Sequence, residues 1–77
     1  MSAMTKAQRL VVKDFEGKFF NLLEEYWNPV DSDKYWDKLT DDAMNLIAEF
    51  QSSDRALNSF LSNVVVSFLN SREEALH

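Results

Sequence analysis

Apolar and polar residues alternate along the chain with the period of an α-helix in three successive stretches. In the clearest stretch the apolar residues recur at intervals of three and four: Leu57, Phe60, Leu61, Val64, Val65, Phe68 and Leu69. Two earlier stripes follow the same rule, one formed by Val12, Phe15, Phe19, Leu22, Leu23 and Tyr26, the other by Trp36, Leu39, Ala43, Leu46, Ile47 and Phe50. A lone amphipathic helix is unstable in water, so the pattern predicts helices that pack on one another.

Capping and turn residues separate the three stripes. Thr5 and Gln8 have the spacing of a capping box, and Pro29 excludes its preceding residue from a helix. Residues 31–33 and 51–55 are polar and contain Asp and Ser, which favour helix starts. We therefore predict an all-α fold, a small antiparallel three-helix bundle, as a single helical domain over residues 1–77. Its helices lie near 5–27, 33–51 and 54–71, and both ends fray.

One alternative to this bundle stays open. No glycine follows Phe50 to close the second helix, and an apolar heptad continues through the junction at Trp36, Ala43, Phe50, Leu57 and Val64. The alternative fold is a helical hairpin with one long second helix, which would be an obligate dimer. We favour a break at residues 51–54, because serine and aspartate compete with helical hydrogen bonds.

The length limits how stable such a bundle can be. A chain of 77 residues buries only about 60–65% of the surface that its unfolded form exposes, and with no cysteine it has no disulfide to add. Self-association is the remaining common source of stability. No apolar run is long enough for a signal peptide or a membrane span. We expect a cytoplasmic protein with no membrane partner.

Charge is concentrated in the middle of the sequence. Residues 31–54 contain seven acidic side chains and two lysines, which gives −5, the net charge of the whole chain, whereas residues 1–30 are neutral. An acidic surface repels nucleic acid, so we expect no nucleic-acid partner. The acidic segment is explained by ordinary solubility, or by docking of a basic protein partner.

The charges of the first helix oppose its own dipole. Lys6 and Arg9 come early in this helix, while Glu24 and Glu25 come late. An antiparallel hairpin explains this placement if the early basic residues approach Glu49 and Asp54. Contact with a partner is the alternative explanation.

Few residues could support chemistry. The single histidine is His77, the last residue, and the single glycine, Gly17, cannot form a phosphate-binding loop. Asp31, Asp33, Asp37 and Asp42 have part of the spacing of a calcium loop, but Tyr35 and Trp36 occupy a ligand position and the glycine position. Acidic residues at a helix start explain them better. We expect no enzyme activity, no metal and no cofactor.

Several apolar residues exceed what one small bundle can bury: Leu10, Val11, Phe20, Trp27 and Val66. Trp27 and Tyr35 lie off the stripes, where large aromatics either anchor an interface or seal the end of the bundle. The sequence predicts a non-catalytic protein-interaction module that forms a homodimer. The alternative function is an acidic inhibitor or immunity-like protein that neutralises a basic protein. The predicted partner-binding residues are Leu10, Val11, Phe20, Trp27, Tyr35, Asp37 and Asp41.

Overall fold

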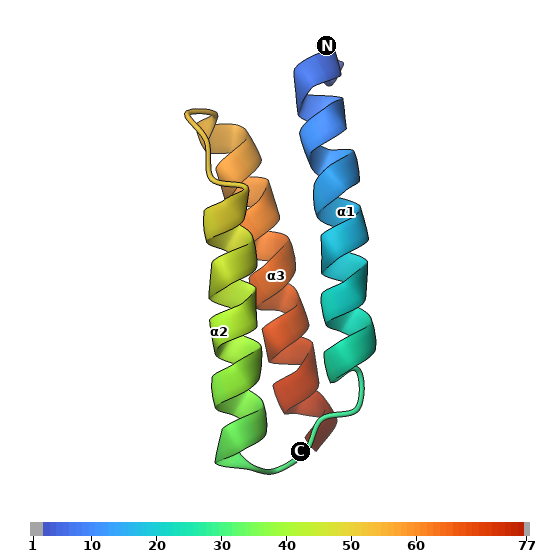
Figure 1. The fold of residues 1–77 in the computed structure, drawn as a ribbon, viewed down its shortest axis with the longest axis vertical. Helices are drawn as coiled ribbons and strands as arrows, with labels where there is room; N and C mark the ends of the chain where they lie inside the picture. Colours follow the sequence, from blue (N-terminus) through green and yellow to red (C-terminus); the bar gives the residue numbers. More distant parts are fainter. Residues whose placement is uncertain (1–2, 77) are drawn as a thin grey trace.

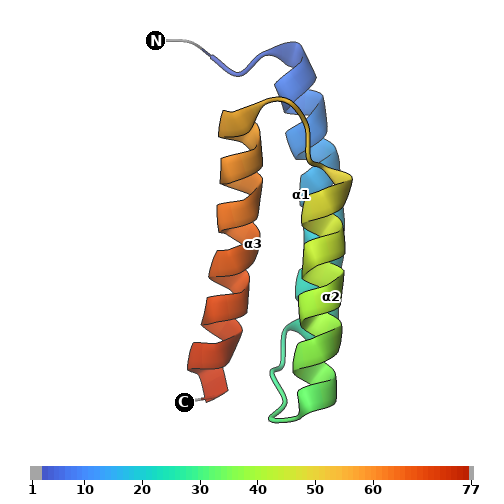
Figure 2. The same cartoon turned by 90° about the vertical axis from the view of Figure 1, so that its left-hand side faces the viewer.

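Three helices in sequence order form the structure, a computed structural model that describes residues 3–76. They are α1 (Lys6–Tyr26), α2 (Asp33–Glu49) and α3 (Arg55–Leu76). α1 and α3 run in one direction and α2 runs in the other, so the described residues form an elongated up-down-up bundle of 42 × 22 × 19 Å. Each pair of helices is in contact (Figures 1 and 2). The prediction of an all-α three-helix bundle is confirmed.

The helices begin where the sequence places capping residues. The Thr5 hydroxyl accepts a hydrogen bond from the Gln8 backbone N–H at 3.1 Å, and the Gln8 side chain accepts one from the Thr5 N–H at 3.0 Å. This reciprocal pair is the predicted capping box. Ser32 caps α2 by accepting from the Tyr35 N–H at 3.2 Å. Free amides of both first turns are thereby satisfied.

The helical conformation is interrupted between α2 and α3, so the alternative fold with one long second helix is excluded. α2 closes without glycine, since the Phe50 N–H reaches the Ile47 carbonyl at 3.3 Å in a tightened last turn. Asp54 then caps α3 by accepting from the Leu57 N–H at 3.1 Å. The Asn58 side chain fixes the loop, accepting from the Ser52 N–H at 2.9 Å and donating to the Ser52 carbonyl at 2.7 Å.

The core takes three residues from each helix, all on the predicted stripes: Phe15, Leu22 and Tyr26; Leu39, Ala43 and Leu46; Leu61, Val65 and Phe68. Phe15 lies between two other rings, with centroids 5.5 Å from Phe19 and 5.6 Å from Phe50. Because all three helices contribute side chains, the hydrophobic core lies between them along the bundle. Burial of these side chains is the main force that holds the helices together.

Two expectations about α3 are wrong. The helix continues through residues 72–76 instead of fraying after Ser71, because Arg72 packs against α1 and holds the last turns in place. Phe60, expected on the core stripe, keeps 52% of its surface exposed. The apolar stripe of α3 is wider than the side of the helix that α1 and α2 cover, and Phe60 lies at its edge.

Candidate interaction surface

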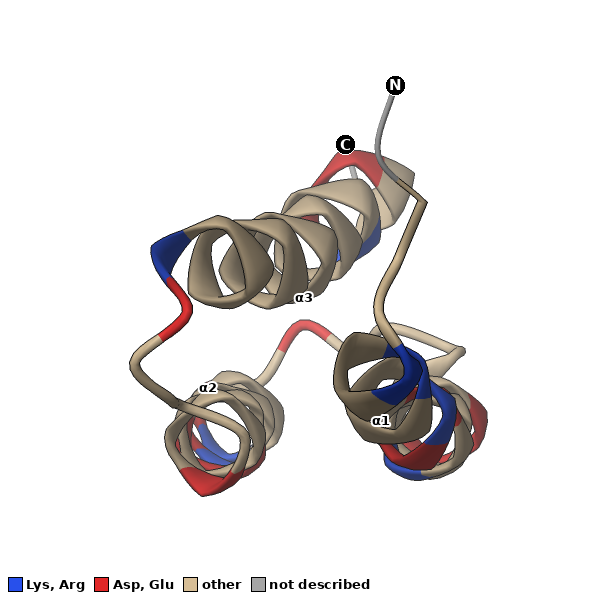
Figure 3. Cartoon of the chain, turned by 90° about the horizontal axis from the view of Figure 1, so that it is seen from above, with Lys and Arg blue, Asp and Glu red and all other residues tan. Residues whose placement is uncertain are grey.

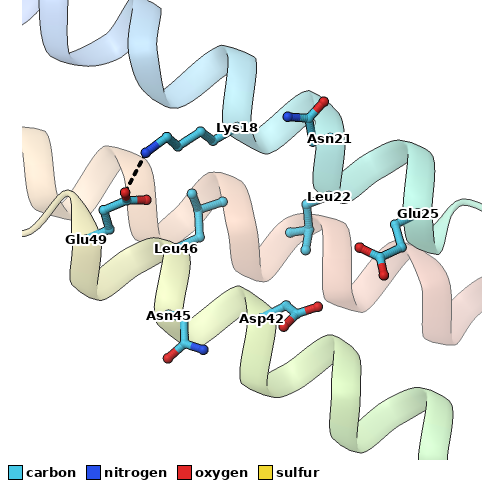
Figure 4. A pocket seen from close by; sticks show the side chains of 8 residues that line it. All are labelled: Lys18, Asn21, Leu22, Glu25, Asp42, Asn45, Leu46 and Glu49. Atoms are coloured by element: carbon cyan, nitrogen blue, oxygen red, sulfur yellow. Dashed lines mark hydrogen bonds and ion pairs between the residues drawn. The ribbon is translucent and has the colours of Figure 1, made fainter.

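Polar and charged side chains line the groove between α1 and α2. Lys18 pairs with Glu49 at 2.5 Å, and Lys38 of α2 pairs with Glu25 of α1 at 3.1 Å. The groove runs between these pairs over two core leucines, and its lining is Lys18, Asn21, Leu22, Glu25, Asp42, Asn45, Leu46 and Glu49 (Figure 4). All four paired side chains are close to half exposed, so this flank is open to water.

Tyr26 makes a further polar link between these two helices. Its ring is buried, and its hydroxyl donates a hydrogen bond to a carboxylate oxygen of Asp42. Burial first, and then the bond to Asp42, raise the pKa of Tyr26 above its usual value of 10.0. This tyrosine stays protonated at neutral pH and acts as a donor inside the bundle.

The expected approach of Lys6 and Arg9 to acidic residues is replaced by other pairs. Glu49 pairs with Lys18, two to three turns further along α1. Asp54 accepts a hydrogen bond from the Gln8 amide at 2.7 Å. This bond, and the one from the Leu57 N–H, lower the pKa of Asp54 below its usual value of 3.8. The Asp54 carboxylate thus links the starts of α1 and α3.

Aromatic rings and one arginine close the end of the bundle where the loop joins α1 to α2. The Tyr35 hydroxyl donates to the Tyr26 carbonyl at 2.6 Å, and its ring centroid lies 4.9 Å from that of Trp36. The Arg72 guanidinium lies 4.6 Å from the Trp27 ring centroid and donates to the Trp27 carbonyl. Arg72 therefore satisfies a free carbonyl at the end of α1 and joins α3 to it.

The predicted apolar and aromatic partner-binding residues lie in different environments. Leu10, Phe20 and Trp27 are exposed at 61%, 58% and 55%. Val11 and Tyr35 are partly buried against the core. Phe20 and Trp27 are two turns apart on one side of α1, where they line a shallow apolar groove with Leu23 and Glu24. Leu10 lies about 80° around the helix from Phe20, so these residues do not form one surface.

The two predicted acidic residues are exposed on the outer side of α2. Asp33, Asp37 and Asp41 follow one another at intervals of four, which places them on one side of the helix. Neither of the two ion pairs in the described residues includes them. Over residues 3–76 the acidic side chains do not gather into a cluster of three that could hold a metal ion.

The outer face of α3 was not among the predicted partner-binding surfaces. Its exposed positions between residues 56 and 70 carry no charge: Ala56, Ser59, Phe60, Asn63, Val66, Ser67 and Asn70. We call this set the α3 outer face. Figure 3 shows α3 without charge except near its ends, whereas charged positions cover the outer sides of α1 and α2. Phe60 and Val66 are 52% and 43% exposed. The sequence shows this uncharged run, but the apolar spacing predicts that Phe60 lies in the core.

None of the described helices has the length and apolar character needed to cross a membrane. Comparisons with protein-family models, with curated proteins and with solved structures find no match to this chain.

Proposed function

We propose that this protein is a non-catalytic helical interaction module that associates with itself. One observation carries the proposal: the bundle leaves large apolar side chains exposed on all three helices and in the first turn. Those with 43–61% of their surface in contact with water are Met4, Leu10, Phe20, Trp27, Val30, Met44, Phe60 and Val66.

The size of the chain explains why such exposure favours association. The core holds nine buried side chains, which is little for a domain that must offset the conformational entropy of its whole chain. Covering an exposed phenylalanine or tryptophan contributes on the order of 1–2 kcal/mol. A second copy therefore supplies stability that the single bundle lacks, in the way that small domains without disulfides commonly gain it.

The test is the molar mass in solution as a function of concentration. Sedimentation velocity and light scattering after size exclusion, from about 5 to about 500 µM, should show a rise from monomer to dimer, as expected for an interface of small area. The control is the same series in 1 M NaCl, where an association driven by apolar burial persists. A strict monomer at the highest concentration contradicts the proposal.

A second candidate function rests on the outer side of α2. The exposed row formed by Asp33, Asp37 and Asp41 presents negative charge on a rigid helix, a surface suited to a basic protein. In this role the chain is an acidic inhibitor or immunity-like protein. Binding to an identified basic protein should weaken with salt and be lost in Asp37→Lys with Asp41→Lys. The matched control is Glu16→Lys with Glu24→Lys on α1; equal binding by both double variants contradicts the inhibitor role.

A further inference from the structure

We propose that the second copy docks on the α3 outer face, with the two α3 helices antiparallel and the two-fold axis beside Asn63. This inference rests on the proposed self-association and specifies its interface. The argument uses the distribution of charge, the spacing of the exposed residues and the charges at the two ends of α3.

Charge distribution selects the face. A two-fold interface places a surface against an identical surface, so a surface whose charges have one sign meets charges of the same sign on the other copy. The chain carries −5, and the outer side of α2 presents its row of aspartates. Two copies meeting through α2 would therefore repel. The α3 outer face has no charge to bring together, and it holds two of the exposed apolar side chains, Phe60 and Val66.

The spacing of the exposed residues fits a partner helix. Along the α3 outer face they recur at intervals of three, one and three, which is a heptad seam directed away from the core. Ala56, Ser59 and Ser67 are small and allow two helices to approach closely. Phe60 and Val66 are equally distant in sequence from Asn63. An antiparallel pair centred on Asn63 thus places each Phe60 against the Val66 of the other copy.

The two ends of α3 set the direction. Arg55 begins the helix, and Glu73 and Glu74 lie in its last turn, all three exposed. In the antiparallel arrangement Arg55 of each copy comes to the level of the acidic end of the other. In a parallel arrangement Glu73 and Glu74 would face their own copies and repel. Antiparallel helix dipoles add to the same preference.

The area of this interface makes the dimer weak and reversible. The uncharged part of α3, residues 56–71, is about 24 Å long, so one helix pair buries less than a standard interface. Trp27 lies on the side of α1 next to α3, since its ring contacts Arg72, and Phe20 lines a shallow groove with Trp27 on that side. They form an apolar rim that the second copy can partly cover.

The first experiment compares charged substitutions on and off this face. Phe60→Lys and Val66→Lys should each weaken dimerisation of the full chain about tenfold or more, measured by sedimentation over a concentration series. Leu10→Lys and Met44→Lys are the matched controls, because these side chains are at least as exposed but lie on α1 and α2. They should change the dissociation constant by less than about twofold. Circular dichroism establishes that all four variants fold.

The second experiment uses milder substitutions and reads the geometry directly. The chain has no cysteine, so an introduced one is the sole thiol. Asn63→Cys should form a disulfide-linked dimer under mild oxidation, whereas Met44→Cys should not. Ala56→Cys mixed with Asn70→Cys should give the crossed dimer, and Ala56→Cys alone should stay monomeric on a denaturing gel. Efficient self-linking by Ala56→Cys means a parallel pair and overturns the antiparallel arrangement.

The outcomes separate this inference from the proposed function. A dimer that survives Phe60→Lys and Val66→Lys but is lost in Leu10→Lys or Met44→Lys keeps self-association and overturns the α3 interface. A monomer at every concentration overturns both the self-association and the α3 interface. In that case the α3 outer face would be a surface for a different protein. Loss of the dimer in the α3 variants alone, together with linkage through Asn63→Cys, supports both.

Discussion

α1 contacts its two neighbours through different chemistry. Towards α2, two ion pairs and the Tyr26–Asp42 hydrogen bond lie over the leucines of the core. Towards α3, the Phe19 and Phe68 rings meet edge to face at 6.1 Å, and Arg72 stacks between Phe68 and Trp27. We refer to these contacts as the α1–α2 and α1–α3 seams.

The two seams differ in their use of charge. The charges of α2 are partly used to hold α1 and otherwise face water. α3 is held mainly by apolar and aromatic contacts and needs no charge between residues 56 and 71. Its outer side between these residues is also uncharged. Ion pairs exposed to water contribute little free energy, so the α1–α3 seam should dominate stability.

The largest effect should come from breaking the α1–α3 seam. Phe68→Ala removes a buried ring from the core and should lower the free energy of unfolding by about 3–5 kcal/mol. The matched control is Phe60→Ala, on the same helix but exposed, which should cost less than about 1 kcal/mol. Urea denaturation at one low protein concentration measures both. Similar losses in the two variants would mean that α3 is packed differently.

The next effect tests the hydrogen bond in the α1–α2 seam. Tyr26→Phe keeps the ring and removes the donor to Asp42, which should cost about 1.5–2 kcal/mol at pH 7. Because the pKa of Tyr26 is higher in the folded chain, its stabilising contribution is complete below pH 10.0 and is lost as the pH rises above that value. Denaturation between pH 8 and 11 should therefore show a steeper alkaline loss in the unsubstituted chain. Equal slopes would contradict this role.

A substitution outside both seams should stabilise the chain. Gly17 is exposed on α1 with ordinary helical dihedrals, and a Cβ placed there meets no atom within 4 Å. Gly17→Ala should therefore raise the free energy of unfolding by about 0.5–1 kcal/mol through helix propensity alone. Thermal unfolding checks this value. Loss of dimerisation in the same variant would instead indicate that a partner backbone approaches α1 at this glycine.

The smallest effect should come from the exposed ion pair of the α1–α2 seam. Lys18→Met should lower the midpoint of thermal unfolding by only about 2 °C, and this decrease should disappear in 1 M NaCl. Lys13→Met, which removes an exposed lysine that is in neither ion pair, is the control. A shift comparable to that of Tyr26→Phe would show that this pair contributes more than its exposure allows.

Periodicity predicted the helical class of the fold and the buried side of each helix. The nine core residues all lie on the three stripes, because burial of one side of a helix leaves a direct record in residue spacing. The capping box at Thr5 and the break at Pro29 also follow from local chemistry. The break after Phe50 depended on a choice between two patterns, and the hydrogen bonds of Ser52, Asp54 and Asn58 decide it.

The surface was less predictable than the core. Spacing alone placed Phe60 inside, since it does not tell how wide a sector two neighbouring helices cover. It also gave no information that Arg72 would reach Trp27, a contact between residues 45 positions apart that orders the last turns of α3. The sequence predicts partner-binding residues on α1 and α2, where surplus aromatics and acids are conspicuous. The uncharged side of α3 is harder to recognise as an interface from the sequence, because serine and asparagine make up most of its exposed positions.

The up-down-up path has a practical consequence for measuring association. Ala3 and Leu76 lie towards opposite ends of a rod whose longest dimension is 42 Å. In an antiparallel pair the N-terminal end of each molecule (its head) lies beside the C-terminal end of the other (its tail). A donor dye on the head of one population and an acceptor on the tail of a second should transfer energy efficiently when mixed. Two populations both labelled at the N-terminal end should transfer energy less efficiently than the mixed pair.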